Sequence, residues 1–315
     1  MSEERTISAS ISKPIAHISR ILFNNGKSLE IEKDDIIVFV GPNNVGKSQS
    51  LKDILMLCDG KKATSVVSDI QVFKKQYPSV DFLNSIAIPQ PGNGYTSFQI
   101  LGETIVINNN SEHIFLHDQY YGDLRELFVI NLNTDARLRI CNPPELISRN
   151  EPRKHPIHYA AFNKEYRKWL ALNYLKAFGD EIIPNTHFGA SVPLCIGSPV
   201  KIDANITDDV ERIERYTDIL SDYKQIQNQG DGIRSYTGIL LYLMLDYYCT
   251  FLIDEPESFL HPPQAQIMGR VIGETLTDNQ QAFIATHSEE IIKGLLSAKP
   301  ERVKIVRISR EGDTN

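Results

Sequence analysis

Apolar residues form short, separate runs at the N-terminal end of the chain, and these runs predict its first elements. Ile36 to Val40 is fully apolar and β-branched, typical of a strand that is buried on both faces of a parallel sheet. Residues 15–23 alternate loosely and precede Asn25-Gly26, so we expect a β-hairpin into residues 28–32. Further on, Leu51, Ile54, Leu55 and Leu57 recur at helical spacing, which predicts an amphipathic helix.

From residue 230 onward, strand and helix patterns alternate. We expect helices at about 233–248, 263–276 and 288–297, and strands at 250–253, 281–285 and 302–308. Such alternation predicts an α/β fold with a mainly parallel sheet flanked by helices, to which the N-terminal hairpin adds an antiparallel part.

The middle of the chain has weaker patterns. Pro89 and Pro91 should interrupt any regular element at residues 88–94. We expect one helix over 161–179, ended by Gly179, and another over 208–223, capped by Asp208 or Asp209. We therefore divide one composite domain into an N-terminal lobe (1–60), an inserted mixed region (61–205) and a C-terminal lobe (206–315).

The composition is that of a globular protein and argues against one class of nucleic-acid-binding protein. Hydrophobic residues at 41% and charged residues at 23% are ordinary for a globular protein, and the net charge of −7 argues against a uniformly basic nucleic-acid-binding coat. Residues 136–168 nevertheless hold eight basic and three acidic side chains. This segment is compatible with contact to a phosphate backbone, but a solvated helix face is the commoner explanation of such a segment.

Several features indicate a soluble cytoplasmic protein without a membrane partner. The four cysteines are far apart and form no CxxC pair, so we expect reduced, buried thiols. The first 13 residues are polar and unlike a secretory signal. No apolar run approaches the ~18–20 residues that a membrane span needs.

A phosphate-binding loop is predicted between the first buried strand and its helix. The pattern G-x-x-x-x-G-K-[ST] is matched by Gly41, Pro42, Asn43, Asn44, Val45, Gly46, Lys47 and Ser48, and Gln49 follows it. Backbone amides and the helix N-terminus would surround the phosphates of ATP. Lys47 would neutralise the β- and γ-phosphates, and the Ser48 hydroxyl would bind Mg²⁺. An ordinary Gly-rich turn is the alternative.

Two adjacent carboxylates end the predicted strand at 250–253. Asp254 would hold Mg²⁺, and Glu255 would polarise the water that attacks the γ-phosphate. The alternative is a solvated helix N-terminus that the helix dipole favours. For Glu257 we expect a role in capping the following turn.

Two further segments complete the set of candidates. His287 follows the next strand and would hydrogen-bond the γ-phosphate, although a lone histidine is often a structural donor. Gly230 and Gly232, with Arg234 after them, open a helix whose N-terminus would bind an anion; a simple capped turn is the alternative.

Together, "GPNNVGKS", "GDGIRS", "LIDEPESFLHP" and "ATHS" resemble the ATP-binding-cassette (ABC) ATPases of the SMC and RecF type. Most closely they resemble the OLD ATPases and their relatives in anti-phage systems such as Septu and some retrons. The resemblance covers residues 15–60 and 225–310. It implies the roles given above for Lys47, Ser48, Asp254, Glu255 and His287, with ATP and Mg²⁺ as cofactors.

The same resemblance implies partners. ABC ATPases of this type form a homodimer around two nucleotides, or a higher oligomer, and "GDGIR" would replace the "LSGGQ" signature that contacts the nucleotide of the opposite subunit. No glutamine is assigned to the Mg²⁺-linked Q-loop. OLD proteins carry a Toprim nuclease domain, for which too few residues follow His287.

We therefore expect either the ATPase part of a longer protein or a separate nuclease partner of the Toprim or HNH type. DNA or a reverse-transcriptase complex would be a further partner. There are two alternatives. One is a RecF- or SMC-like DNA-repair ATPase, and the other is a binding module whose assembly with partners is switched by nucleotide binding, with little hydrolysis.

Overall fold

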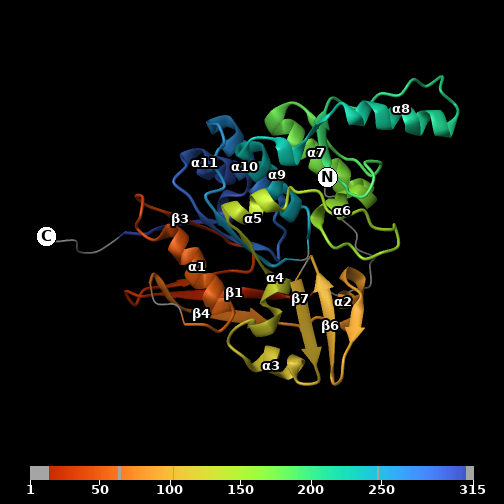
Figure 1. Cartoon of the computed structure of the whole chain (residues 1–315). Coiled ribbons are helices and arrows are strands. Elements are labelled where there is room, and N and C mark those ends of the chain that lie inside the picture. The colour runs from red at the N-terminus through yellow and green to blue at the C-terminus, as the bar shows by residue number, and fades with distance from the viewer. Residues whose placement is uncertain (1–13, 63–64, 102, 247, 310–315) are drawn as a thin grey trace.

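A five-stranded parallel sheet lies at the centre of the computed structural model, which describes residues 14–62, 65–101, 103–246 and 248–309 (Figure 1). The strand order is β14-β3-β13-β12-β8, and every neighbouring pair is parallel. Its strands are β3 (Ile36–Val40), β8 (Val129–Leu132), β12 (Thr250–Asp254), β13 (Gln281–Ala285) and β14 (Val303–Arg307). The sheet thus draws strands from all three segments of the sequence, and the predicted α/β fold class is confirmed.

Helices cover both faces of this sheet. In Figure 1, α9, α10 and α11 lie on one side of the sheet and α1 lies on the other. A Cβ atom at Gly269 of α10 would lie 2.2 Å from the carbonyl oxygen of Ile291 in α11, so glycine permits the close contact of these helices. The helices are α1 (Lys47–Cys58), α5 (Thr134–Arg139), α9 (Asp231–Leu243), α10 (Pro262–Thr275) and α11 (Glu289–Ala298).

An antiparallel sheet of order β2-β1-β4 packs on the far side of α1, which contacts both β4 and the central strands β12 and β13. Its strands are β1 (Ala16–Phe23), β2 (Ser28–Glu30) and β4 (Val67–Lys74). The buried Gln281 joins the two sheets. Its Oε1 accepts from the amide of Ile18 at 2.8 Å, and its Nε2 donates to the carbonyl of the same residue at 3.1 Å.

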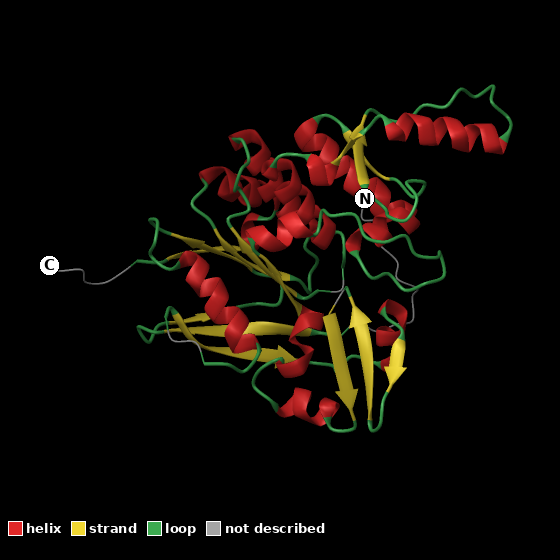
Figure 2. Cartoon of the chain, viewed as in Figure 1, coloured by secondary structure: helices red, strands yellow, loops and turns green. Residues whose placement is uncertain are grey.

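The inserted region, together with residues 206–228 of the C-terminal lobe, adds two small antiparallel sheets and several helices (Figure 2). The sheets consist of β5 (Pro89–Pro91), β6 (Tyr95–Ile100) and β7 (Glu103–Asn108), and of β9 (Glu181–Pro184), β10 (Leu194–Gly197) and β11 (Lys224–Gln225). The helices are α2 (Val80–Ile86), α3 (Ser111–His117), α4 (Arg125–Phe128), α6 (Pro156–Phe162), α7 (Lys164–Phe178) and α8 (Asp209–Ser221), with single turns η1 (Gly122–Leu124) and η2 (Ile226–Asn228). A third single turn, η3 (Pro300–Arg302), directly precedes β14. Helix α8 projects from the body in Figure 1.

Two predictions for this region are wrong. Pro89 and Pro91 do not prevent a strand, because β5 pairs with β6 at the exposed edge of its sheet, where a missing amide donor is tolerated. The helix expected over 161–179 is present as α7 and ends at Gly179 as predicted, but its expected start is wrong, because residues 161 and 162 belong to the separate helix α6. Asn163 between them is extended, and its side chain accepts from the amides of Glu165 and Tyr166 to start α7.

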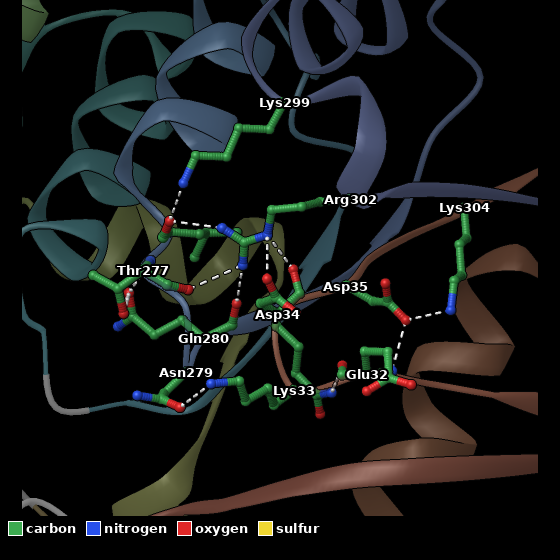
Figure 3. A network of polar contacts seen from close by, with 12 residues as sticks. Glu32, Lys33, Asp34, Asp35, Thr277, Asn279, Gln280, Lys299, Arg302 and Lys304 are labelled. Carbon is green, nitrogen blue, oxygen red and sulfur yellow. Dashed lines mark hydrogen bonds and ion pairs between the residues drawn. The ribbon is translucent and has the colours of Figure 1, made fainter.

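A polar network ties the amino-terminal edge of the central sheet together (Figure 3). Arg302, at the end of η3, donates to the carbonyls of Leu276, Thr277 and Gln280 at 2.8 to 3.0 Å, and it pairs with Asp34. The network joins the α10–β13 loop to the segment before β3. It lies at the opposite edge from the loops described next, so it supports the sheet without entering the site.

Two further expectations can be compared with the structure. All four cysteines, each within the described part of the chain, are buried free thiols, as predicted. Among the described helices, none is long and apolar enough to cross a membrane.

Candidate active site

The carboxyl ends of β3, β13 and β12 meet at one edge of the central sheet, and each is followed by a predicted site segment. The loop Gly41–Ser48 follows β3, Asp254 ends β12 with Glu255 directly after it, and His287 comes just after β13. The hydroxyl of Ser48 donates to Oδ1 of Asp254 at 2.7 Å, across 206 positions of sequence. The structure therefore places the loop and the acidic strand end side by side.

The loop Gly41–Ser48 has a backbone that glycine makes possible. Gly41, Asn44 and Gly46 have positive φ angles of 151°, 62° and 109°. A Cβ atom at Gly41 would lie 2.3 Å from the carbonyl oxygen of Ile308. Gly46 is the N-cap of α1 and leaves the first amides of that helix without a side-chain cap. The resulting cradle fits a phosphate group, which such amides bind.

Lys47 folds back over this loop. Its side chain is 7% exposed, and Nζ donates to the carbonyls of Gly41 at 2.9 Å and Pro42 at 2.8 Å. The positive charge is thus already held at the cradle, where anionic oxygens would be stronger acceptors than neutral carbonyls. Gln49, the last residue of the predicted set, instead donates to Asp53 at 2.8 Å within α1. Asn43 lies in the same loop.

Asp254 carries an electrostatic cost that a cation would relieve. Its burial raises the pKa of its carboxyl group, the Ser48 hydroxyl opposes this rise, and the neighbouring Glu255 adds to it. Ser48 and Asp254 both offer the oxygen ligands that Mg²⁺ prefers, and Mg²⁺ usually retains several waters. In the described ranges no group of three His, Cys, Asp or Glu side chains could hold a metal ion. Ser48 and Asp254 offer two oxygen ligands beside the phosphate cradle. This arrangement fits an Mg²⁺ ion that keeps several of its waters, rather than a metal ion surrounded by protein ligands.

Glu255 is held in an unusual backbone conformation. Its φ angle is 45°, which costs a non-glycine residue of order 1–3 kcal/mol, and its amide donates to the carbonyl of Ala285 at 2.8 Å. The side chain is 43% exposed and its Oε1 lies 3.8 Å from Nδ1 of His287, which is 54% exposed. The structure therefore brings the two predicted catalytic residues together in a position that water can reach.

Glu257 does not cap the following turn, so this prediction is wrong. The turn that begins at Glu255 directs its side chain inward, where it is 8% exposed. Its Oε1 accepts from the Thr286 hydroxyl at 2.7 Å and from the His287 amide at 3.0 Å. Glu257 therefore fixes the end of β13 against the end of β12.

Arg137 is a functional candidate that the sequence does not reveal. Arg137 belongs to the basic segment 136–168, which the sequence predicts to be exposed, but its side chain is fully buried. Its guanidinium donates to the carbonyls of Asp254 and Glu255 (3.2 Å for the latter) and to the Ser235 hydroxyl of α9 at 3.0 Å. Burial lowers its pKa to about 10, and the nearby carboxylates oppose that change.

This contact set rules out a phosphate-backbone role and a solvated role for Arg137. Of its neighbours in the basic segment, Arg139 and Lys154 have side chains that are 73% and 59% exposed. For Arg139 and Lys154, contact with a phosphate backbone and exposure on a solvated face are both compatible with the structure.

The predicted "GDGIR" segment forms the start of α9, with Gly230 as its N-cap. A Cβ atom at Gly232 would lie 2.4 Å from the carbonyl oxygen of Phe259, so α9 packs against the turn after β12. Arg234 donates to the carbonyl of Leu138 at 3.0 Å and pairs with Asp231 at 3.3 Å. Within the described residues, Gly230, Gly232 and Arg234 have no hydrogen bond or ion pair with the loop Gly41–Ser48.

A cavity of about 830 Å³ opens beside the loop, between the β1–β2 hairpin and the end of β14. Polar and apolar side chains both line it. Its lining includes Asn24, Lys27, Asn44, Gln49, Val66 and Arg307. The phosphate cradle is therefore continuous with a larger space.

Comparison with known proteins supports the architecture. No protein-family model matches the chain, and no curated protein matches it by sequence. A solved structure of an Smc head bound to the C-terminal winged-helix domain of ScpA matches with a TM-score of 0.53 and 13% identity, over 94% of this chain and 95% of that one. The chain has the fold of an SMC head, an ABC-type ATPase fold.

Two further SMC heads match less well. The head from Pyrococcus furiosus, with an extended coiled coil and the C-terminal domain of ScpA, gives a TM-score of 0.48 at 12% identity, with 93% of each chain covered. The head from Thermotoga maritima gives 0.43 at 14% identity, over 88% of this chain and 92% of that one.

Proposed function

We propose that this chain is an ABC-class ATPase that binds ATP with Mg²⁺ between the loop Gly41–Ser48 and Asp254. The observation that carries the proposal is the 2.7 Å contact between Ser48 and Asp254, which joins the phosphate cradle to the acidic strand end. When bound, Mg²⁺ would supply the positive charge that the oxygens of Ser48 and Asp254 need. The triphosphate would supply the bond that hydrolysis breaks.

Each side chain then has a definite task. Lys47 and the amides at the start of α1 bind phosphate oxygens, and Ser48 and Asp254 hold the metal. Glu255 accepts a proton from the attacking water, for which its exposure is suitable. His287 donates to the reacting phosphate, and Arg137 fixes the backbone that carries both carboxylates.

The substitution Glu255→Gln tests this proposal. It keeps the shape of the side chain and removes the base, so we expect ATP affinity close to wild type and turnover at least about a hundredfold lower. Phosphate release and equilibrium binding of a fluorescent ATP analogue would measure the two effects. Unchanged hydrolysis would show that Glu255 is not the base. Background turnover of the wild type, alone and with DNA, would favour the assembly module.

We further propose that ATP drives homodimerisation and that the dimer controls a DNA-cleaving nuclease domain or partner. This part rests on the resemblance to OLD and Septu ATPases and on the exposed start of α9, where a Cβ at Gly230 would meet nothing within 4 Å. Purification of the native complex tests it, because a co-purifying Toprim or HNH nuclease would support it. A complex with DNA-repair proteins and no nuclease would favour the RecF- or SMC-like alternative.

A further inference from the structure

We infer that Glu257 is a positioning residue that holds the His287 ring in one tautomer and keeps it away from Glu255. The inference rests on the proposed ATPase function, since it assigns a task within the same site. His287 and Glu257 are directly in contact, with Nδ1 3.1 Å from Oε1. The corresponding separation between His287 and Glu255 is 3.8 Å.

The contacts of Glu257 determine which nitrogen of the ring carries a proton. Oε1 accepts from the Thr286 hydroxyl and from the His287 amide, and it faces Nδ1 of the same histidine. A carboxylate oxygen can only accept hydrogen bonds, so Nδ1 is the protonated nitrogen. The other nitrogen, Nε2, is then free to take up a second proton, and only the doubly protonated ring can donate from Nε2 to the reacting phosphate.

The geometry also separates the tasks of two carboxylates. Glu257 is 8% exposed and is bound by the residues that follow β13. Glu255 is 43% exposed, and it accepts a longer hydrogen bond of 3.3 Å from the Ser258 hydroxyl. If Glu257 were absent, Nδ1 of His287 would have Glu255 as its nearest carboxylate. That pairing would occupy the proposed base, so Glu257 keeps Glu255 available for water.

A purely structural link between strand ends would not need a carboxylate. The amide oxygen of a glutamine would accept the same bonds from Thr286 and from the His287 backbone at a lower cost of burial. The second oxygen of Glu257, Oε2, is buried and has no hydrogen-bond partner within the described residues. What only the carboxylate supplies is negative charge beside Nδ1, which also stabilises a positive charge on the ring during reaction.

A double-mutant cycle on turnover tests the inference. We expect Glu257→Ala to lower kcat by about tenfold to a hundredfold, as loss of a histidine-orienting partner does elsewhere, with little change in ATP affinity. In a His287→Ala background the same substitution should have no further effect on kcat, because its target is gone. An equal loss of kcat in both backgrounds would overturn the inference and leave Glu257 a structural role only.

Two variants separate orientation from folding. Thr286→Val removes the other side-chain partner of Oε1 and should lower the melting temperature while turnover stays close to wild type. Glu257→Gln keeps the shape and the loop contacts, so it should melt like wild type and turn over more slowly. Should the alanine variant fail to fold, the glutamine variant takes its place in the cycle. Wild-type turnover of a stable Glu257→Gln variant would contradict the inference.

A spectroscopic test does not depend on ATP hydrolysis. Ring ¹⁵N shifts of His287, measured well above the ~6.5 pKa of a free histidine, should show protonated Nδ1 in the wild type. Glu257→Ala should shift the ring toward the Nε2-protonated form. If the wild type shows protonated Nε2, the inference fails even when the ATPase proposal holds. If hydrolysis is absent while Nδ1 carries the proton, the ATPase proposal fails and the tautomer assignment stands.

Discussion

Two oppositely charged side chains are buried beneath the candidate active site, and both hold backbone there. Arg137 binds the carbonyls at the end of β12, and Glu257 binds the residues that follow β13. Alanine at either position would leave the buried backbone groups that these side chains now hold without a hydrogen-bond partner, which is destabilising. Substitutions at these two positions therefore need a stability measurement beside every activity measurement.

At Lys47 the expected effect is on binding. Lys47→Ala removes the cation at the phosphate cradle, so we expect ATP affinity to fall by at least about tenfold, the effect of losing one charge-assisted contact. The fold should persist, because Nζ is bound only to two loop carbonyls. Isothermal titration calorimetry would measure the affinity. Lys293→Ala on the surface of α11 is the control, and equal affinities for both variants would contradict the assignment.

Some residues of the site could be predicted because they belong to short motifs of consecutive residues. Gly41, Lys47 and Ser48 stand in one motif, and Asp254 follows a strand that is visible as an apolar run. Arg137 could not be found in this way. Its task depends on β8 pairing with β12, which lies about 120 residues further along, and local patterns contain no information about that pairing.

Among the elements, helix α6 has a titratable cap. Nδ1 of His155 accepts from the amide of Ile157 at 3.2 Å, which requires a neutral ring. Burial, with a smaller contribution from His158, lowers the pKa of His155 from 6.5 to about 3. The cap therefore contributes its full stability above about pH 6.5 and loses it as the pH falls toward 3.

His155→Asn tests this cap. Asparagine can cap the helix without titrating, so the variant should lose less stability than wild type when the pH is lowered from about 7.5 to about 5. Urea denaturation at the two values would measure the difference. Identical pH dependence of the two proteins would show that this ring does not titrate on unfolding.

Element prediction succeeded where one local cause dominates. The strands of the C-terminal lobe are apolar runs between clear helices, and all appear close to the expected ranges. In the inserted region the deciding contacts are distant or subtle. β5 forms because it can pair with β6 at the edge of the small sheet. α7 is separate from α6 because the extended backbone of Asn163 ends one helix and its side chain caps the next. Neither outcome follows from hydrophobic periodicity.

At the scale of the whole molecule, the proposed ATP-bound homodimer can be tested at the start of α9. Gly230→Asp adds negative charge at open space, so the monomer should fold and bind ATP normally. A dimer that places this helix end on a partner's phosphates should be lost through charge repulsion. We expect Glu255→Gln with ATP to sediment as a dimer and Gly230→Asp/Glu255→Gln to sediment as a monomer.

Gly232→Ala is the matched comparison for that experiment. Its Cβ would collide with the Phe259 carbonyl, so this variant should lower thermal stability, whereas Gly230→Asp should not. A double variant, Gly230→Asp/Glu255→Gln, that still dimerises with ATP would place the interface elsewhere.

The contact between Gly41 and Ile308 has a consequence for biogenesis. The phosphate cradle packs against Ile308, the residue after β14, and β14 pairs directly with β3. The ribosome therefore has to release the chain through β14 before the first lobe can close, and such remote pairing slows folding. If the loop Gly41–Ser48 binds nucleotide as proposed, a newly made chain acquires that ability only after β14 has emerged and paired with β3.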